Sequence, residues 1–112
     1  MQADNIFSDL PVELAGELIE PLLQSQHLRI ERIVSLGQIT PEGQWYDQTE
    51  DEWVLLLQGQ ARLQLQQQPD EISLQTGDYL HIPARCKHRV SWTDPDQTTL
   101  WLALFFTAGS DL

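Results

Sequence analysis

Residues 45–59 read WYDQTEDEWVLLLQG, residues 77–83 read GDYLHIP and residues 87–90 read KHRV. The first stretch passes from a polar loop into an unbroken apolar run and ends at Gly59, which is typical of a buried strand followed by a turn with positive φ. The second begins with a Gly-Asp turn and ends at a proline, which withholds a backbone donor and so ends a strand. The third starts another strand at His88. These stretches predict consecutive short strands, with His88 facing inward.

The same pattern extends in both directions from this region. Short apolar runs alternate with clusters of Gly, Pro, Asp and Gln at spacings typical of antiparallel hairpins. We expect strands at residues 28–36, 53–57, 61–66, 72–74, 79–82, 88–92 and 100–106. Two of these strands, 53–57 and 100–106, are apolar on both faces, so both of their faces must be covered. Short strands at this density predict a sandwich or a small barrel.

The N-terminal segment predicts a short helix. Four leucines would share one face of such a helix because they lie four residues apart: Leu10, Leu14, Leu18 and Leu22. Pro21 should end or bend the helix, because an interior proline removes a donor and clashes with the preceding turn. The chain is therefore divided into an N-terminal helical segment at 1–26, a barrel domain at 27–107 and a C-terminal tail at 108–112.

The composition limits the classes of partner. The 112 residues include six Lys and Arg against seventeen Asp and Glu, which gives a formal net charge of −11. Binding to nucleic acid or to an anionic membrane requires a basic surface, so we expect neither partner. Cys86 is the single cysteine, which excludes an internal disulfide, and no apolar run reaches membrane-spanning length. We expect an acidic, cytoplasmic, single-domain protein whose partner is a small-molecule ligand.

Two motifs in the quoted stretches resemble those of the cupin superfamily, a group of small jelly-roll barrels, and in particular its single-domain bacterial members of conserved barrel type 2. The first cupin motif ends in a Glu, six residues and a Gly, which are matched here by Glu52 and Gly59. The second motif runs from a Gly through a Pro to a His, matched by Gly77, Pro83 and His88. The resemblance implies an all-β, cupin-type jelly-roll β-barrel, to which this chain adds the short N-terminal helix.

The resemblance also implies a divalent metal, which the family holds with two His and the Glu of the first motif and with the His of the second. Neither first-motif His is present, because the matching positions hold Tyr46 and Gln48, or their preceding neighbours if the loop is one residue longer. The candidate metal ligands that remain are Glu52, His88, Asp47 and Gln48, with Tyr46 as a further oxygen donor. The candidate ions are Zn, Fe, Ni and Mn, held less tightly than by three imidazoles. The alternative is that His88 is a core histidine bonded to Glu52 or a Tyr hydroxyl.

Four further side chains are candidates for contacting a ligand at the barrel mouth. Trp45 and Tyr46 lie in the loop before Glu52, where they can form an apolar wall. Arg85 can hold a ligand carboxylate in a bidentate geometry, or else pair with a nearby acidic side chain. Trp92 stands where the second motif commonly has Asn. The other histidines, including His81 within a strand, are expected to lie outside the pocket.

Three functions are compatible with the sequence. A binding or sensing cupin would take up a small molecule through Glu52, His88 and Tyr46, and the loss of the two motif histidines favours it. A metal-dependent cupin enzyme, an oxygenase or isomerase, would use the retained Glu52 and His88. A non-catalytic, oligomerising accessory domain with a filled barrel would explain the strands that are apolar on both faces. Those strands also predict a homodimer.

Overall fold

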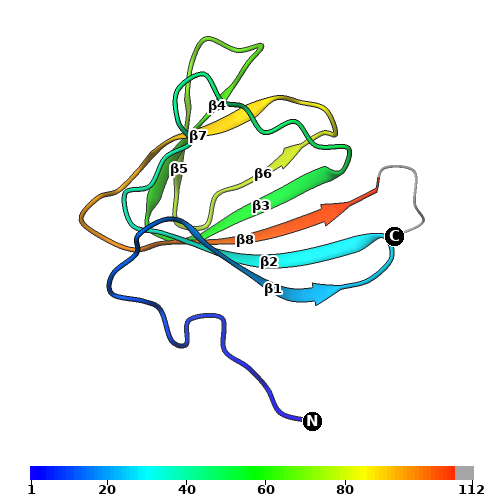
Figure 1. Ribbon diagram of the computed structural model, residues 1–112, viewed down its shortest axis with the longest axis vertical. Coiled ribbons are helices and arrows are strands. Elements are labelled where there is room, and N and C mark those ends of the chain that lie inside the picture. The colour runs from blue at the N-terminus through cyan, green and yellow to red at the C-terminus, as the bar shows by residue number, and fades with distance from the viewer. Residues whose placement is uncertain (108–112) are drawn as a thin grey trace.

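Two antiparallel sheets enclose the core of the molecule (Figure 1). The computed structural model describes residues 1–107, and within them the strands are β1 (Leu18–Gln24), β2 (Leu28–Ser35), β3 (Asp51–Gln58), β4 (Gln60–Leu65), β5 (Ile72–Gln75), β6 (Tyr79–Ile82), β7 (His88–Thr93) and β8 (Thr99–Phe106). One sheet has the order β1-β2-β8-β3-β6, and the other has the order β5-β4-β7. The predicted all-β architecture is confirmed, and the seven predicted strands correspond to β2 to β8.

The core lies between the two sheets because each sheet turns one apolar face towards the other. Val54 and Ala103 belong to the five-stranded sheet, while Leu63 and Leu74 belong to the three-stranded sheet, and all four are buried in one hydrophobic cluster. In β4 the buried residues alternate with exposed polar ones, as expected for a strand with one wet face. β3 and β8 are apolar on their outer faces as well, and those outer side chains are only partly covered.

Gly59 forms the corner at which the chain leaves one sheet and enters the other. It joins β3 to β4 with a φ of 94°, which confirms the predicted positive φ. A Cβ placed on Gly59 would lie 2.6 Å from the hydroxyl of Thr99 and 2.8 Å from the carbonyl oxygen of Thr98. The corner therefore requires glycine both for its backbone conformation and for the close approach of β8.

The predicted N-terminal helix is wrong. The structure contains no helix in residues 1–107, and Leu18 and Leu22 lie instead in β1, which pairs with β2. Pro21 is accommodated because β1 is an edge strand and its register shifts between Pro21 and Leu23. The leucine spacing fitted a helix, but pairing with the open edge of β2 satisfies the backbone without placing a proline inside a helix.

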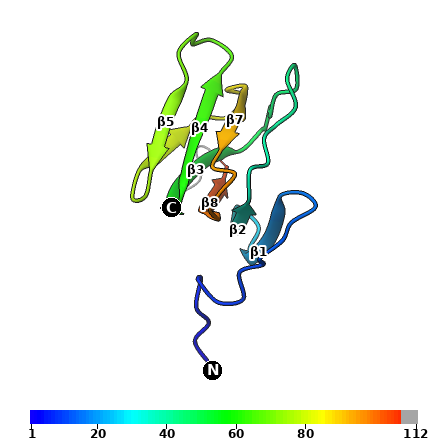
Figure 2. The same ribbon diagram turned by 90° about the vertical axis from the view of Figure 1, so that its left-hand side faces the viewer.

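The segment before β1 is held on the outside of the five-stranded sheet by Arg32. Its guanidinium donates to the carbonyl oxygens of Ile6 and Ser8 at 2.9 and 2.7 Å, and it pairs with Glu20. This segment lies beside β1 and β2, remote from the three-stranded sheet (Figure 2). The expected domain boundary after residue 26 falls in the turn between β1 and β2. The predicted tail at 108–112 lies outside the described residues.

Candidate functional site

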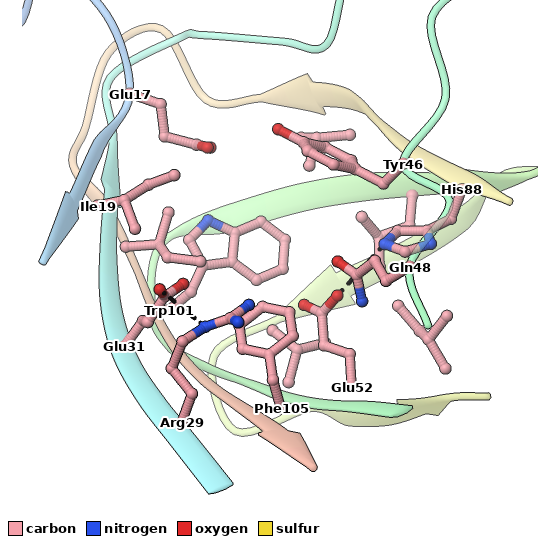
Figure 3. A pocket seen from close by; sticks show the side chains of 15 residues that line it. Glu17, Ile19, Arg29, Glu31, Tyr46, Gln48, Glu52, His88, Trp101 and Phe105 are labelled. Atoms are coloured by element: carbon pink, nitrogen blue, oxygen red, sulfur yellow. Dashed lines mark ion pairs between the residues drawn. The ribbon is translucent and has the colours of Figure 1, made fainter. Parts of the chain in front are cut away.

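A cavity of about 280 Å³ opens between the two sheets (Figure 3). Apolar side chains from both sheets form much of its wall, including Val54, Leu63 and Trp101. The polar side chains that line it are Glu17, Arg29, Glu31, Tyr46, Gln48, Glu52 and His88. Small-molecule sites have this character, a mostly apolar hollow with a few polar groups that converge on it.

Glu52 and His88 form a buried ion pair at one side of the cavity. Glu52 faces inward from β3 and His88 begins β7, and their side chains are 10% and 5% exposed. Nε2 of His88 lies 3.3 Å from Oε1 of Glu52. Nδ1 lies 2.8 Å from the carbonyl oxygen of Cys86, which can only accept, so Nδ1 carries a proton. The predicted inward orientation of His88 and its proximity to Glu52 are both observed.

Both partners of His88 favour its charged form. Burial alone would lower the pKa of His88, but hydrogen bonding to Glu52, hydrogen bonding to the Cys86 carbonyl and the negative charge of Glu52 outweigh it. The pKa of His88 therefore lies above its ordinary value of 6.5.

Tyr46 and Gln48 reach the cavity from the loop before β3. The backbone of Tyr46 exchanges two hydrogen bonds with His88, at 2.7 and 3.1 Å, which fixes this loop against β7. The Tyr46 ring lies 5.6 Å from the imidazole, centroid to centroid. Burial and the charges of Glu17 and Glu52 raise the pKa of the Tyr46 phenol above its ordinary value, against the effect of a hydrogen bond with Thr40. Tyr46 therefore presents a neutral hydroxyl to the cavity, and Figure 3 shows this hydroxyl on the Glu17 side of the ring.

Glu17, which is not among the residues predicted from sequence, lies on the opposite side of the cavity (Figure 3). It precedes β1, and the Ser35 hydroxyl donates to Oε2 at 3.1 Å. Burial raises the pKa of the Glu17 carboxyl, and the negative charge of Glu52 adds to this, although the bond from Ser35 acts in the other direction. Because residues around 17 were assigned to a helix, their place beside the barrel opening could not be anticipated.

Arg29 and Glu31 line the cavity from β2 and were also missed. Nη1 of Arg29 donates to Glu50 at 2.9 Å, and Nε lies 3.1 Å from Glu31 at an angle that makes an ionic contact rather than a hydrogen bond. The guanidinium lies 4.1 Å from the centre of the Phe105 ring. The sequence contains a pattern that could have identified them. Residues 29 and 31 are charged and alternate with apolar residues 28 and 30, and alternate residues of a strand share one face.

The structure separates the eight predicted site residues into two groups. Glu52, His88, Gln48 and Tyr46 line the cavity, whereas Asp47, Arg85, Trp45 and Trp92 are not part of its lining. Nε of Arg85 lies 3.1 Å from Oδ1 of Asp47, with the Arg85 side chain 63% exposed. Trp92 instead packs against the Arg62 guanidinium. His81 is exposed, as expected, and pairs with Asp51 at 2.7 Å.

The residues around Glu52 and His88 do not match a transition-metal centre held by three or four protein ligands. Within residues 1–107, no group of three or more His, Cys, Asp or Glu side chains is close enough together to hold an ion. Tyr46 and Gln48 stand where the resemblance implies imidazoles, and Asp47, which could have added a carboxylate, pairs with Arg85. Zinc and iron centres require nitrogen, sulfur or carboxylate ligands in that number, so the side chains around Glu52 and His88 do not fit such an ion.

The raised pKa values at this site predict how stability changes with pH. His88 and Glu17 both hold protons more tightly in the folded state than in the unfolded state. The stability that this adds is fully present below their unfolded pKa values and is lost as pH rises through their folded pKa values. We expect urea denaturation to show lower stability at pH 8 than at pH 6. His88→Gln should reduce this difference, whereas His27→Gln at an exposed position should not. An unchanged difference in His88→Gln would contradict the assignment.

Comparisons with known proteins agree with the barrel fold described above. The family described as "Cupin domain" matches residues 34–105. A crystal structure from Ralstonia eutropha JMP134, provisionally named a mannose-6-phosphate isomerase, is 42% identical, and the match covers 96% of this chain and 100% of that chain with a TM-score of 0.93. No curated protein matches the chain.

Two more distant structures share the fold alone. A cupin superfamily protein from Desulfitobacterium hafniense DCB-2 is 20% identical, with 88% of this chain and 84% of that chain covered and a TM-score of 0.72. A cupin family protein from Methanocaldococcus jannaschii, with a double-stranded β-helix fold, is 16% identical, with 88% and 87% covered and a TM-score of 0.69. Among residues 1–107, no helix is long and apolar enough to cross a membrane.

Proposed function

The chain belongs to the cupin family, and from that premise we propose that it binds a small molecule between the sheets of its barrel, at a site centred on Glu52 and His88. The observation that carries this proposal is the cavity itself, because a buried ion pair lines an open space of about 280 Å³. A barrel that served only as a scaffold would gain stability by filling that space with apolar side chains. Buried polar groups beside open space are instead typical of a binding site.

A fragment screen by ¹H–¹⁵N NMR tests this function. We expect fragments to shift the backbone amides of Glu52 and His88 while leaving the indole N–H of Trp92, which lies outside the cavity, unchanged. Val90→Phe should abolish these shifts because Val90 lines the cavity and a larger ring would occupy it. Val12→Phe at an exposed position is the matched control. Fragments that shift only residues outside the cavity, or shifts that persist in Val90→Phe, would refute the proposal.

A metal-dependent isomerase or oxygenase is the second candidate function. It is favoured by the relative from R. eutropha, whose name assigns isomerisation of a sugar phosphate, and by the retained Glu52 and His88. The incomplete donor set argues for the binding function instead. Elemental analysis of protein purified without chelator separates the two. We expect substoichiometric metal. Near-stoichiometric Zn, Fe, Ni or Mn that disappears in His88→Ala would favour the metal-dependent candidate, and oxygen consumption would then be measured.

We also propose that two copies associate through the outer face of the five-stranded sheet. The half-buried side chains of Trp53, Leu55 and Leu104 lie on this face, and Tyr79, which is 66% exposed, packs against Trp53 with ring centres 5.5 Å apart. We expect light scattering to give the mass of a dimer for the wild type and of a monomer for Tyr79→Arg. Val12→Arg is the control, since Val12 is exposed outside the strands. A monomeric wild type at high concentration would exclude this interface.

A further inference from the structure

The cations of the cavity are already paired. Arg29 contacts Glu50 at 2.9 Å and Glu31 at 3.1 Å, and His88 lies 3.3 Å from Glu52. Arg29 and His88 are the cationic side chains that line the cavity. An anionic ligand would therefore have to displace an existing carboxylate, and it would remain beside that carboxylate after doing so.

Glu17 adds a carboxyl group that has no cationic partner within residues 1–107. Among residues 1–107 its hydrogen bond comes from the Ser35 hydroxyl, and no Lys, Arg or His nitrogen lies within ion-pair distance. With Glu31 and Glu52, it gives the cavity three carboxyl groups against two cations. The excess is acidic, which disfavours phosphate or carboxylate groups on a ligand.

Trp101 supplies a donor that has no partner in the described part of the chain. Its indole is 3% exposed and lines the cavity, and Nε1 makes no hydrogen bond among the described residues. Figure 3 shows this nitrogen on the side of the cavity where Glu17 and Ile19 lie, across from His88. A buried N–H costs free energy unless it meets an acceptor. The neutral Tyr46 hydroxyl can both donate and accept, and the Trp101 and Phe105 rings offer apolar surface beside these groups.

We propose, resting on the proposed binding function, that the ligand is an uncharged polyhydroxy compound of monosaccharide size and that its phosphorylated form is excluded. Ligand hydroxyls can accept from the Trp101 indole and donate to Glu17 and Glu52, which an apolar fragment cannot do. A phosphate would meet three carboxyl groups and no free cation. This ligand class differs from the sugar phosphate in the name of the relative from R. eutropha, which is 42% identical.

Ligand pairs that differ by one phosphate test the proposal: mannose and mannose 6-phosphate, glycerol and glycerol 3-phosphate, and inositol and inositol 1-phosphate. Each is titrated into ¹⁵N-labelled protein while the Trp101 indole N–H is followed, with Trp92 as the internal reference. We expect at least one neutral compound to shift Trp101, with a Kd at least about tenfold lower than that of its phosphorylated partner. Trp101→Phe, which keeps a ring but removes the donor, should weaken that binding about two- to tenfold.

A charge variant gives a second test of selectivity. Glu17→Gln keeps the side-chain size and an acceptor for Ser35 but removes the charge, so the phosphorylated compound should gain affinity relative to its neutral partner. Glu20→Gln is the control, because it changes the net charge by the same amount. Glu20 pairs with Arg32 and does not line the cavity, so this variant should leave selectivity unchanged.

The outcomes separate this inference from the proposed function. Tighter binding of a phosphorylated compound at Trp101, or equal binding of both partners, would overturn the inference while leaving the function in place. If fragments bind in the cavity but no compound of any pair shifts Trp101, the polyhydroxy ligand class is wrong and the binding function stands. If neither the fragments nor the pairs shift residues of the cavity, both the inference and the binding function fail.

Discussion

His88→Ala is expected to lower the free energy of unfolding by about 3–5 kcal/mol and to remove ligand binding. The variant leaves Glu52 buried, with its side chain 10% exposed, and without the imidazolium that compensates its charge. The loss should be largest near pH 6, where the raised pKa of His88 keeps the wild-type pair charged. Urea denaturation monitored by tryptophan fluorescence measures the effect, and His27→Ala is the exposed-histidine control.

A double-mutant cycle shows whether the cost comes from the pair itself. The Glu52→Ala/His88→Ala double variant should lose less stability than the sum of the losses in the two single variants. The reason is that the second substitution removes the charge that the first left unpaired. Glu52→Gln preserves the shape of the side chain and should be the mildest change. Additive costs, or a His88→Ala variant as stable as His27→Ala, would show that the pair is not coupled. If His88→Ala does not fold, a cycle of Glu52→Gln, His88→Gln and their double variant measures the coupling instead.

Gly59→Ala is expected to destabilise the protein by about 2–5 kcal/mol, through backbone strain and overpacking together. Its φ of 94° is unfavourable for a residue with a Cβ, and the new atom would lie 2.6 Å from the Thr99 hydroxyl and 2.8 Å from the Thr98 carbonyl. Backbone atoms of β8 cannot move aside without disturbing the centre of the five-stranded sheet.

Gly77 provides a matched control for this substitution. It has the same φ of 94°, but apart from its two chain neighbours no heavy atom of the described residues lies within 4 Å of the Cβ position. Gly77→Ala should therefore cost only the conformational strain, about 1–2 kcal/mol. The difference between the two midpoints of urea denaturation isolates the effect of close packing at the corner. Equal losses in the two variants would show that β8 yields at this point.

The strands from β2 to β8 could be predicted because local signals agree along that part of the chain. Apolar runs with a period of two, or apolar on both faces, are bounded by glycine, proline and Asp-containing turns. β1 could not be predicted in this way, since its leucine spacing fits a helix and Pro21 is unusual in a strand. Its conformation depends on pairing with β2, a contact that the sequence of β1 does not specify.

The site was predicted in part for a similar reason. The family motifs identified Glu52 and His88, and the match of the family to residues 34–105 confirms that prediction of family. The role of Trp101 could not be anticipated, because a tryptophan in an apolar strand is indistinguishable by sequence from a core residue. Only the folded arrangement shows that its N–H has no partner among residues 1–107. Glu17 was missed because its position depends on β1, the strand that was mistaken for a helix.

The position of β8 has a consequence for how the protein is made in the cell. β8 lies between β2 and β3 at the centre of the five-stranded sheet, although it follows both of them in the chain. During synthesis, β2 and β3 therefore emerge from the ribosome long before the strand that pairs with both of them. Until β8 is released, the nascent chain exposes two apolar strand edges, the kind of surface that chaperones recognise and that aggregates form through. Completion of the five-stranded sheet therefore waits for β8, and a stall in translation before β8 would leave an aggregation-prone chain.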